Sequence, residues 1–141
     1  MNDMERAKRL LAEGDYTCAA CRGDEEYVSA KRGVRPLLEL IDAARSLAGY
    51  SAADRVVGRA AAYLYVELET PRVYAHVMSR AAQEVFDRYG VEHSADKVVD
   101  AIENRTNTGL CPMESAVWNI TDAHEAELAI REKVKELMGS K

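Results

Sequence analysis

The segment from residue 104 to residue 109 has the side chains best suited to holding a ligand. Its content of asparagine, threonine, arginine and glycine predicts a polar loop rather than a helix or strand. Amide, guanidinium and hydroxyl groups in such a loop can donate hydrogen bonds to an anionic ligand. The candidate ligand-binding residues here are Asn104, Arg105, Thr106, Thr108 and Gly109. The alternative is a turn without a binding role.

Two candidate catalytic residues, Cys111 and Glu114, follow this loop. A thiol near the start of a helix is a stronger nucleophile than a free thiol because the helix dipole favours its thiolate. Glu114 can carry a proton, or it can serve as a negative charge in the first turn of a short helix. The alternative for Cys111 is a small buried hydrophobic side chain, since no histidine close in sequence is placed to activate it.

Two further candidate binding positions lie where a predicted strand is followed by a predicted helix. Gly58 allows close approach of a ligand to the backbone, and Arg59 can pair with a phosphate or carboxylate. Ser79 and Arg80 offer a hydroxyl and a guanidinium at the second position. The alternative is that Gly58 serves packing, that both arginines are solvated and that Ser79 only caps its helix.

These positions depend on an alternation of strands and helices that the hydrophobic pattern predicts. The predicted strands are 16–21, 26–30, 52–57 and 73–78, and the predicted helices are 4–13, 33–47, 58–69, 80–89, 114–119 and 123–138. Residues 91–102 fit either a short strand before a helical turn or a strand that begins only at residue 98. A hairpin followed by alternating elements predicts an α/β fold of three layers, α-β-α. Its mixed sheet would carry an N-terminal β-hairpin and then parallel strands.

We expect one domain over residues 1–141, with an N-terminal helix within 1–14 and a C-terminal helix within 121–141. The chain has 48% hydrophobic and 30% charged residues and a net charge of −5, which makes nucleic-acid binding unfavourable. No apolar run reaches the roughly 20 residues that span a bilayer, and the N-terminus lacks the pattern of a secretory signal. Three cysteines, an odd number, are expected to be free thiols. Together these features predict a cytoplasmic protein.

The remaining notable residues are expected to have structural roles. Lys31, Arg32 and Arg35 form a basic cluster that we interpret as surface charge, with an anion site as the alternative. Phe86 and Trp118 are predicted to fill the core. The last helix is predicted to bury Leu128, Ile130, Val134, Leu137 and Met138 and to expose Glu125, Glu127, Arg131, Glu132, Lys133, Lys135 and Glu136.

Several stretches of the sequence resemble a family of small, uncharacterised bacterial and archaeal proteins that is classified as a domain of unknown function. They are 16–18 (YTC), 32–38 (RGVRPLL), 54–62 (DRVVGRAAA), 73–75 (VYA) and 104–114 (NRTNTGLCPME). The last stretch is the most distinctive. The resemblance implies a cytidine-deaminase-like fold, and it implies a fold more strongly than a function.

The residues of a zinc-dependent deaminase are missing. That chemistry needs a His or Cys ligand, a Glu two residues later and a P-C-x-x-C pair, at the starts of two helices. The corresponding stretches here read GRAAA from residue 58 and SRAA from residue 79. Cys18 and Cys21 have the spacing of a metal-binding pair, but residues three apart on a strand point to opposite faces. We therefore expect no metal and no cofactor.

The sequence leads to one preferred hypothesis and two alternatives. The preferred hypothesis is a metal-free protein that binds a small anionic ligand such as a nucleotide at the two helix starts and the 104–114 segment. The first alternative is an enzyme of another chemistry that uses Cys111 or Glu114. The second is a homodimeric interaction or scaffold protein.

Overall fold

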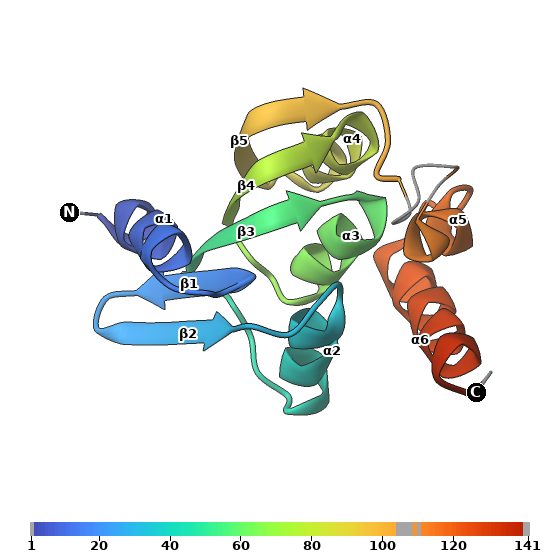
Figure 1. The fold of residues 1–141 in the computed structure, drawn as a ribbon, viewed down its shortest axis with the longest axis horizontal. Helices are drawn as coiled ribbons and strands as arrows, with labels where there is room; N and C mark the ends of the chain where they lie inside the picture. Colours follow the sequence, from blue (N-terminus) through green and yellow to red (C-terminus); the bar gives the residue numbers. More distant parts are fainter. Residues whose placement is uncertain (1, 104–108, 110, 140–141) are drawn as a thin grey trace.

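The structure is a computed structural model that describes residues 2–103, 109 and 111–139 (Figure 1). Its helices are α1 (Asp3–Glu13), α2 (Arg35–Asp42), α3 (Arg59–Glu67), α4 (Arg80–Tyr89), α5 (Pro112–Val117) and α6 (Ala123–Gly139). Its strands are β1 (Cys18–Arg22), β2 (Glu25–Ser29), β3 (Ser51–Val57), β4 (Arg72–Ser79) and β5 (Glu92–Val99).

The five strands form one mixed sheet in the order β2-β1-β3-β4-β5. The hairpin strand β1 pairs antiparallel with both β2 and β3, whereas β3, β4 and β5 pair in parallel. The sequence prediction of an α/β fold with an N-terminal hairpin followed by parallel strands is therefore confirmed. The parallel strands run in the same direction, so that their C-terminal ends lie on the side of the molecule that carries α5 (Figure 1).

Helices cover both faces of the sheet. On one face, Ala7 and Leu11 of α1 pack against Ala19 and Cys21 of β1 and against β3 and β4. The other face packs against α2, α3 and α4. Cys18 belongs to this second core, so Cys18 and Cys21 lie on opposite faces, as their spacing predicted.

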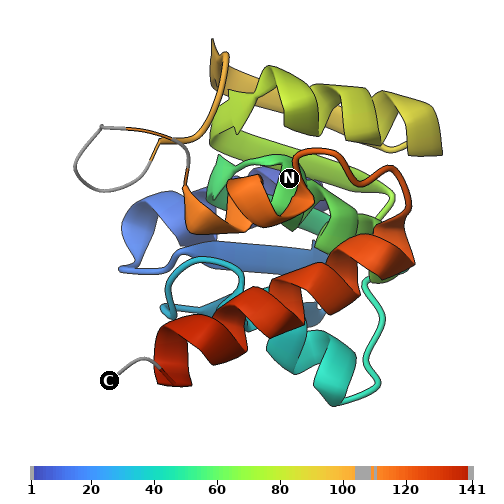
Figure 2. The same ribbon diagram turned by 90° about the vertical axis from the view of Figure 1, so that its right-hand side faces the viewer.

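Helix α3 is the most enclosed of the described helices, and all its residues from Ala60 to Tyr65 are buried. It lies between the sheet and α6, whose N-terminal half packs on it through Ala123, Ala126 and Ile130 (Figure 2). The predicted apolar stripe of α6 is therefore only partly right. Ile130 is buried and Val134 is partly buried, but Leu128, Leu137 and Met138 are exposed. The face of α6 that packs on α3 is the one that carries Ala123 and Ala126. The predicted exposure of Glu127 was wrong, since this residue is buried beside Arg131.

Three further predictions need correction. Residues 92–99 form one continuous edge strand, β5, because parallel pairing with β4 overrides the weak local pattern. Helix α2 ends at Asp42 rather than Leu47, and Ala44 then has a φ of 55°. Trp118 is 43% exposed rather than buried, because α5 ends one residue earlier and its buried face carries Glu114 and Val117. Phe86 is buried as predicted.

No helix within the described residues is long and apolar enough to span a membrane.

Candidate functional site

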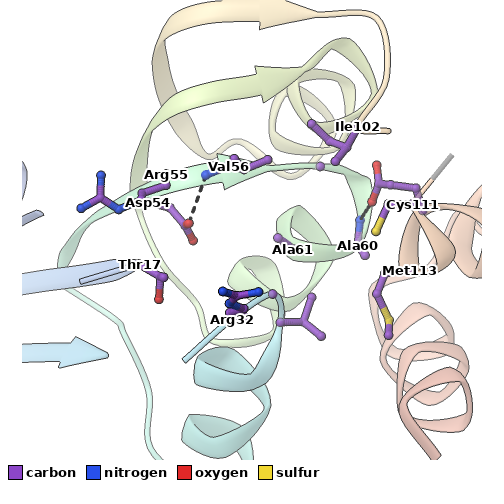
Figure 3. A pocket seen from close by; sticks show the side chains of 14 residues that line it. Thr17, Arg32, Asp54, Arg55, Val56, Ala60, Ala61, Ile102, Cys111 and Met113 are labelled. Carbon is purple, nitrogen blue, oxygen red and sulfur yellow. Dashed lines mark hydrogen bonds between the residues drawn. The ribbon is translucent and has the colours of Figure 1, made fainter. Parts of the chain in front are cut away.

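A cavity of about 220 Å³ lies beside the C-terminal half of β3 (Figure 3). The residue before β1, the β2–α2 connection, β3, the start of α3 and the start of α5 all contribute to it. Its polar side chains are Thr17, Arg32, Asp54, Arg55, Cys111 and Glu114. Its apolar walls include Val34, Val56, Ala60, Ala61, Ile102 and Met113. Ligands of open α/β sheets bind at this end of the strands.

The carboxylate of Glu114 occupies the start of α3. Its Oε1 accepts a hydrogen bond from the Arg59 backbone N–H at 2.7 Å, and its Oε2 accepts one from the Ala60 N–H at 2.8 Å. Burial raises the pKa of Glu114, while the two amides and the Arg59 guanidinium oppose that rise. The side chain thus holds the place where an external anion would bind at this helix start. An anionic ligand bound there would have to displace Glu114.

Gly58 makes this arrangement possible. A Cβ atom added at Gly58 would lie 2.5 Å from Oε1 of Glu114, which is too close for any real contact. The close approach that the sequence predicted at Gly58 is therefore an approach by a side chain of the same chain. Arg59 is also engaged, because its guanidinium donates to the carbonyls of Val117 at 3.0 Å and Ile120 at 2.5 Å. Both interactions fasten the α5–α6 segment to α3.

Asp54 is the most unusual charged residue of the cavity. It lies on β3 next to Arg55, among residues that are mostly apolar, and its carboxyl group points into the cavity (Figure 3). Its Oδ2 accepts a hydrogen bond from the hydroxyl of Tyr65 at 2.6 Å, and the Tyr65 hydroxyl lies 3.4 Å from Sγ of Cys18. Burial is the main cause that raises the pKa of Asp54 to about 6, although the Tyr65 hydrogen bond opposes it. A carboxyl group in this state can accept hydrogen bonds from a ligand or exchange a proton with it.

Arg32 supplies positive charge to the same cavity. It is exposed, and within the described residues it makes no ion pair or side-chain hydrogen bond. Two other basic residues nearby do have partners. Lys31 pairs with Glu39, and the guanidinium of Arg55 donates to the carbonyls of Tyr16 and Leu11. Arg32 also lines an adjoining groove of about 870 Å³, together with Arg35. The basic cluster of the sequence therefore borders the cavity through Arg32.

The second predicted helix start lies apart from this cavity. Ser79 caps α4, its hydroxyl accepting a hydrogen bond from the Ala82 N–H at 3.1 Å. The guanidinium of Arg80 pairs with Asp100 at 2.8 Å. Neither residue lines the 220 Å³ cavity. The structure thus brings Gly58, Cys111 and Glu114 together but leaves Ser79 and Arg80 elsewhere.

The polar loop is only partly described. Asn104, Arg105, Thr106 and Thr108 lie outside the described residues, and Gly109 is exposed. The residues on either side of the segment meet at the cavity, because the Cys111 N–H donates to the carbonyl of Ile102 at 3.0 Å and both residues line the wall. A binding role for the loop residues stays a prediction.

The sequence analysis missed Asp54, Tyr65 and Thr17 as residues of the site. A signal existed for Asp54, since an aspartate in the alanine- and valine-rich strand 52–57 would be costly to bury without a partner. No comparable signal marked Tyr65, which resembles its apolar helical neighbours. Their contact depends on the packing of α3 against β3.

One group of described residues could ligate a metal ion, and it shares no residue with the cavity. The ligand atoms of Glu67, His124 and Glu127 lie within 4.8 Å of one another, between α3 and α6. Arg131 already donates to Glu127 at 2.8 Å and pairs with Asp42. Glu127 therefore already has a cationic neighbour from the same chain.

Cys111 is expected to react with an alkylating reagent much faster than the other two thiols. It is partly exposed in the cavity wall, whereas Cys18 and Cys21 are buried and burial raises the pKa of both. Mass spectrometry after a short treatment of native protein should show one modification, mapped to Cys111. Equal labelling of all three cysteines would contradict this placement, and treatment of unfolded protein provides the reference for full labelling.

Comparison with known proteins places the chain in a structural context. A family model described as a domain of unknown function (DUF1893) matches residues 6–134. The crystal structure of the DUF1893 family protein TM1506 from Thermotoga maritima is similar, with a TM-score of 0.87 and 25% sequence identity. The match covers 94% of this chain and 90% of that one. No curated protein matches the sequence.

Proposed function

We propose that this chain, which belongs to the DUF1893 family, binds a small anionic ligand such as a nucleotide in the cavity beside β3. The observation that carries the proposal is that Arg32 and Asp54 line the same cavity. Arg32 has no acidic partner among the described residues, and Asp54 offers a partly buried carboxyl group opposite apolar walls. The anionic part of the ligand binds Arg32, and its uncharged part enters the cavity.

Binding accounts for the arrangement better than catalysis does. Both carboxylate oxygens of Glu114 are used by backbone amides, so this residue is committed to structure. The described histidines lie near other carboxylates, since His76 contacts Asp96, His93 contacts Asp87, and His124 lies near Glu67 and Glu127. Cys111 therefore lacks a histidine base among the described residues. Slow labelling of Cys111 would remove the enzymatic alternative altogether.

The homodimeric alternative has one supporting observation. Leu128, Leu137 and Met138 of α6 are exposed apolar side chains that a partner could cover. Sedimentation that shows a monomer at every protein concentration would remove this alternative.

The proposal includes a cytidine-deaminase-like fold without the zinc chemistry. Support comes from the hairpin at one edge of the sheet and from α3 and α4, which each begin where a parallel strand ends. At the start of α3, where such a deaminase carries a zinc ligand and a catalytic glutamate, this chain has Gly58, Arg59 and the carboxylate of Glu114.

Thermal unfolding in the presence of nucleotides tests the proposed function. We expect one or more nucleoside monophosphates at millimolar concentration to raise the melting temperature, because a ligand that binds only the folded state stabilises it. Arg32→Ala should weaken the affinity about tenfold or more, the value of a lost charge-assisted hydrogen bond. The matched control is Arg45→Ala, which removes an exposed arginine outside the cavity. If no nucleotide shifts the melting temperature, or if both variants bind equally well, the proposal fails.

A further inference from the structure

The polar groups that face the cavity interior are hydrogen-bond acceptors. The Thr17 hydroxyl donates to the carbonyl of Lys31 at 2.6 Å, so its oxygen can only accept from a ligand. Glu114 already uses two of the donors at the α3 start, the amides of Arg59 and Ala60. Within the described lining, the guanidinium of Arg55 also donates to backbone carbonyls. A ligand group that enters this interior must therefore bring its own donors.

Asp54 sets the geometry that those donors must match. Tyr65 uses one lone pair on Oδ2, and the Val56 N–H donates a long hydrogen bond of 3.4 Å to Oδ1. A carboxylate has about four acceptor positions in its plane, so two remain for a ligand. Two parallel N–H donors on one planar group fill such a pair best, as in bidentate guanidinium–carboxylate contacts.

We infer that the cavity recognises a planar group with two neighbouring N–H donors, the edge that guanine shares with guanidinium compounds. The inference rests on the proposed function and names the ligand class of the same site. Asp54 accepts the two donors, the apolar walls formed by Val56, Ala61 and Met113 contact the ring faces, and Arg32 binds the anionic end. Adenine and cytosine present a donor beside an acceptor, and uracil presents a donor between two acceptors. Neither arrangement matches an ionised carboxylate.

The pH dependence of the binding affinity distinguishes a ligand edge with two donors from an edge with a donor and an acceptor. Groups near Asp54 include Tyr65 on α3, Cys18 on β1 and Arg55 on β3, and Arg32 and Glu114 line the same cavity. With the pKa of Asp54 raised to about 6 by burial, the ionised form that binds two donors predominates at pH 7.5. Affinity for a two-donor edge should fall as the pH decreases below 6. Affinity for a donor–acceptor edge, which needs a protonated Asp54, should rise instead.

The experiment is a calorimetric titration of the full chain with three ligands: GMP, IMP and L-arginine. IMP lacks only the 2-amino group of GMP, and L-arginine offers a guanidinium from another source. We expect GMP to bind at least tenfold more tightly than IMP at pH 7.5. Asp54→Asn should abolish that preference, because an amide presents one acceptor and one donor. The control is Asp15→Asn, at an exposed aspartate outside the cavity.

The outcomes distinguish this inference from the proposed function. Equal affinities for GMP and IMP overturn the inference and leave nucleotide binding intact. Binding of L-arginine alone, lost in Asp54→Asn, supports the two-donor edge and overturns guanine as its source. Absence of binding by all three ligands overturns the inference, and the wider nucleotide series by thermal unfolding then decides the proposed function. The melting temperature of each variant without ligand shows that it is folded.

Discussion

Glu114→Ala is expected to lower the free energy of unfolding by about 3 kcal/mol, because Glu114 holds the start of α3. The change leaves the backbone N–H groups of Arg59 and Ala60 without their acceptor, and both bonds are made to a charged group. It also removes one of the contacts that fasten α5 to the start of α3. Urea-induced unfolding, followed by circular dichroism, measures the loss. Glu132→Ala, at an exposed glutamate on α6, is the control and should cost less than about 0.5 kcal/mol.

Gly58→Ala tests the same contact from the other side. The added Cβ would lie 2.5 Å from Oε1 of Glu114 and must displace the carboxylate. We therefore expect a loss similar to that of Glu114→Ala, and a double variant that is little worse than either single variant, since both changes break one contact. Fully additive losses, or a neutral Glu114→Ala, would show that the carboxylate does not cap α3.

Asp54→Asn is expected to change how stability depends on pH. The pKa of Asp54 rises from its ordinary 3.8 to about 6 in the folded protein, so folding favours the protonated form. A carboxyl group with a raised pKa contributes stability below pH 3.8, and this contribution is lost as the pH rises through 6. Relative to Asp54→Asn, the unsubstituted protein should lose up to about 3 kcal/mol between pH 4 and pH 7.5.

The measurement is urea unfolding of both proteins across this pH range. Burial also raises the pKa values of Glu67 and Glu114, but these groups are present in both proteins and cancel in the difference. Asp15→Asn should give a flat difference, because its side chain is exposed. A flat difference for Asp54→Asn as well would mean that Asp54 is ionised without cost and is not buried in the cavity wall.

Local patterns predicted the elements with strong signals. The hairpin, the strand 73–78 and the helix from Arg80 to Tyr89 with its serine and glycine caps all follow from alternation, turn residues and capping. Strand β5 could not be predicted in the same way, because five of its eight residues are polar or charged and pairing with β4 decides its structure. The exposure of Trp118 likewise depends on where α5 ends.

The candidate site was predicted only in part for a related reason. The sequence indicated that Gly58, Arg59, Cys111 and Glu114 have special roles, and three of them line one cavity. It could not show that Glu114 binds the amides of Arg59 and Ala60, since these residues are more than 50 positions apart. The contact between Asp54 and Tyr65 depends in the same way on helix packing. Positions that attract an anion are visible in a sequence, but a carboxylate that already fills one is not.

The most direct test of the central claim is a titration of ¹⁵N-labelled protein with GMP, followed through the backbone amide signals. We predict saturable shifts of the amides around the cavity, above all those of Gly33, Val56, Gly58 and Cys111. Amides of α4, including Glu84 and Asp87, should remain unchanged. Saturable shifts confined to α4 or β5 would place the ligand at another site. Unchanged spectra at millimolar GMP, and with the other nucleotides, would contradict a nucleotide-binding cavity.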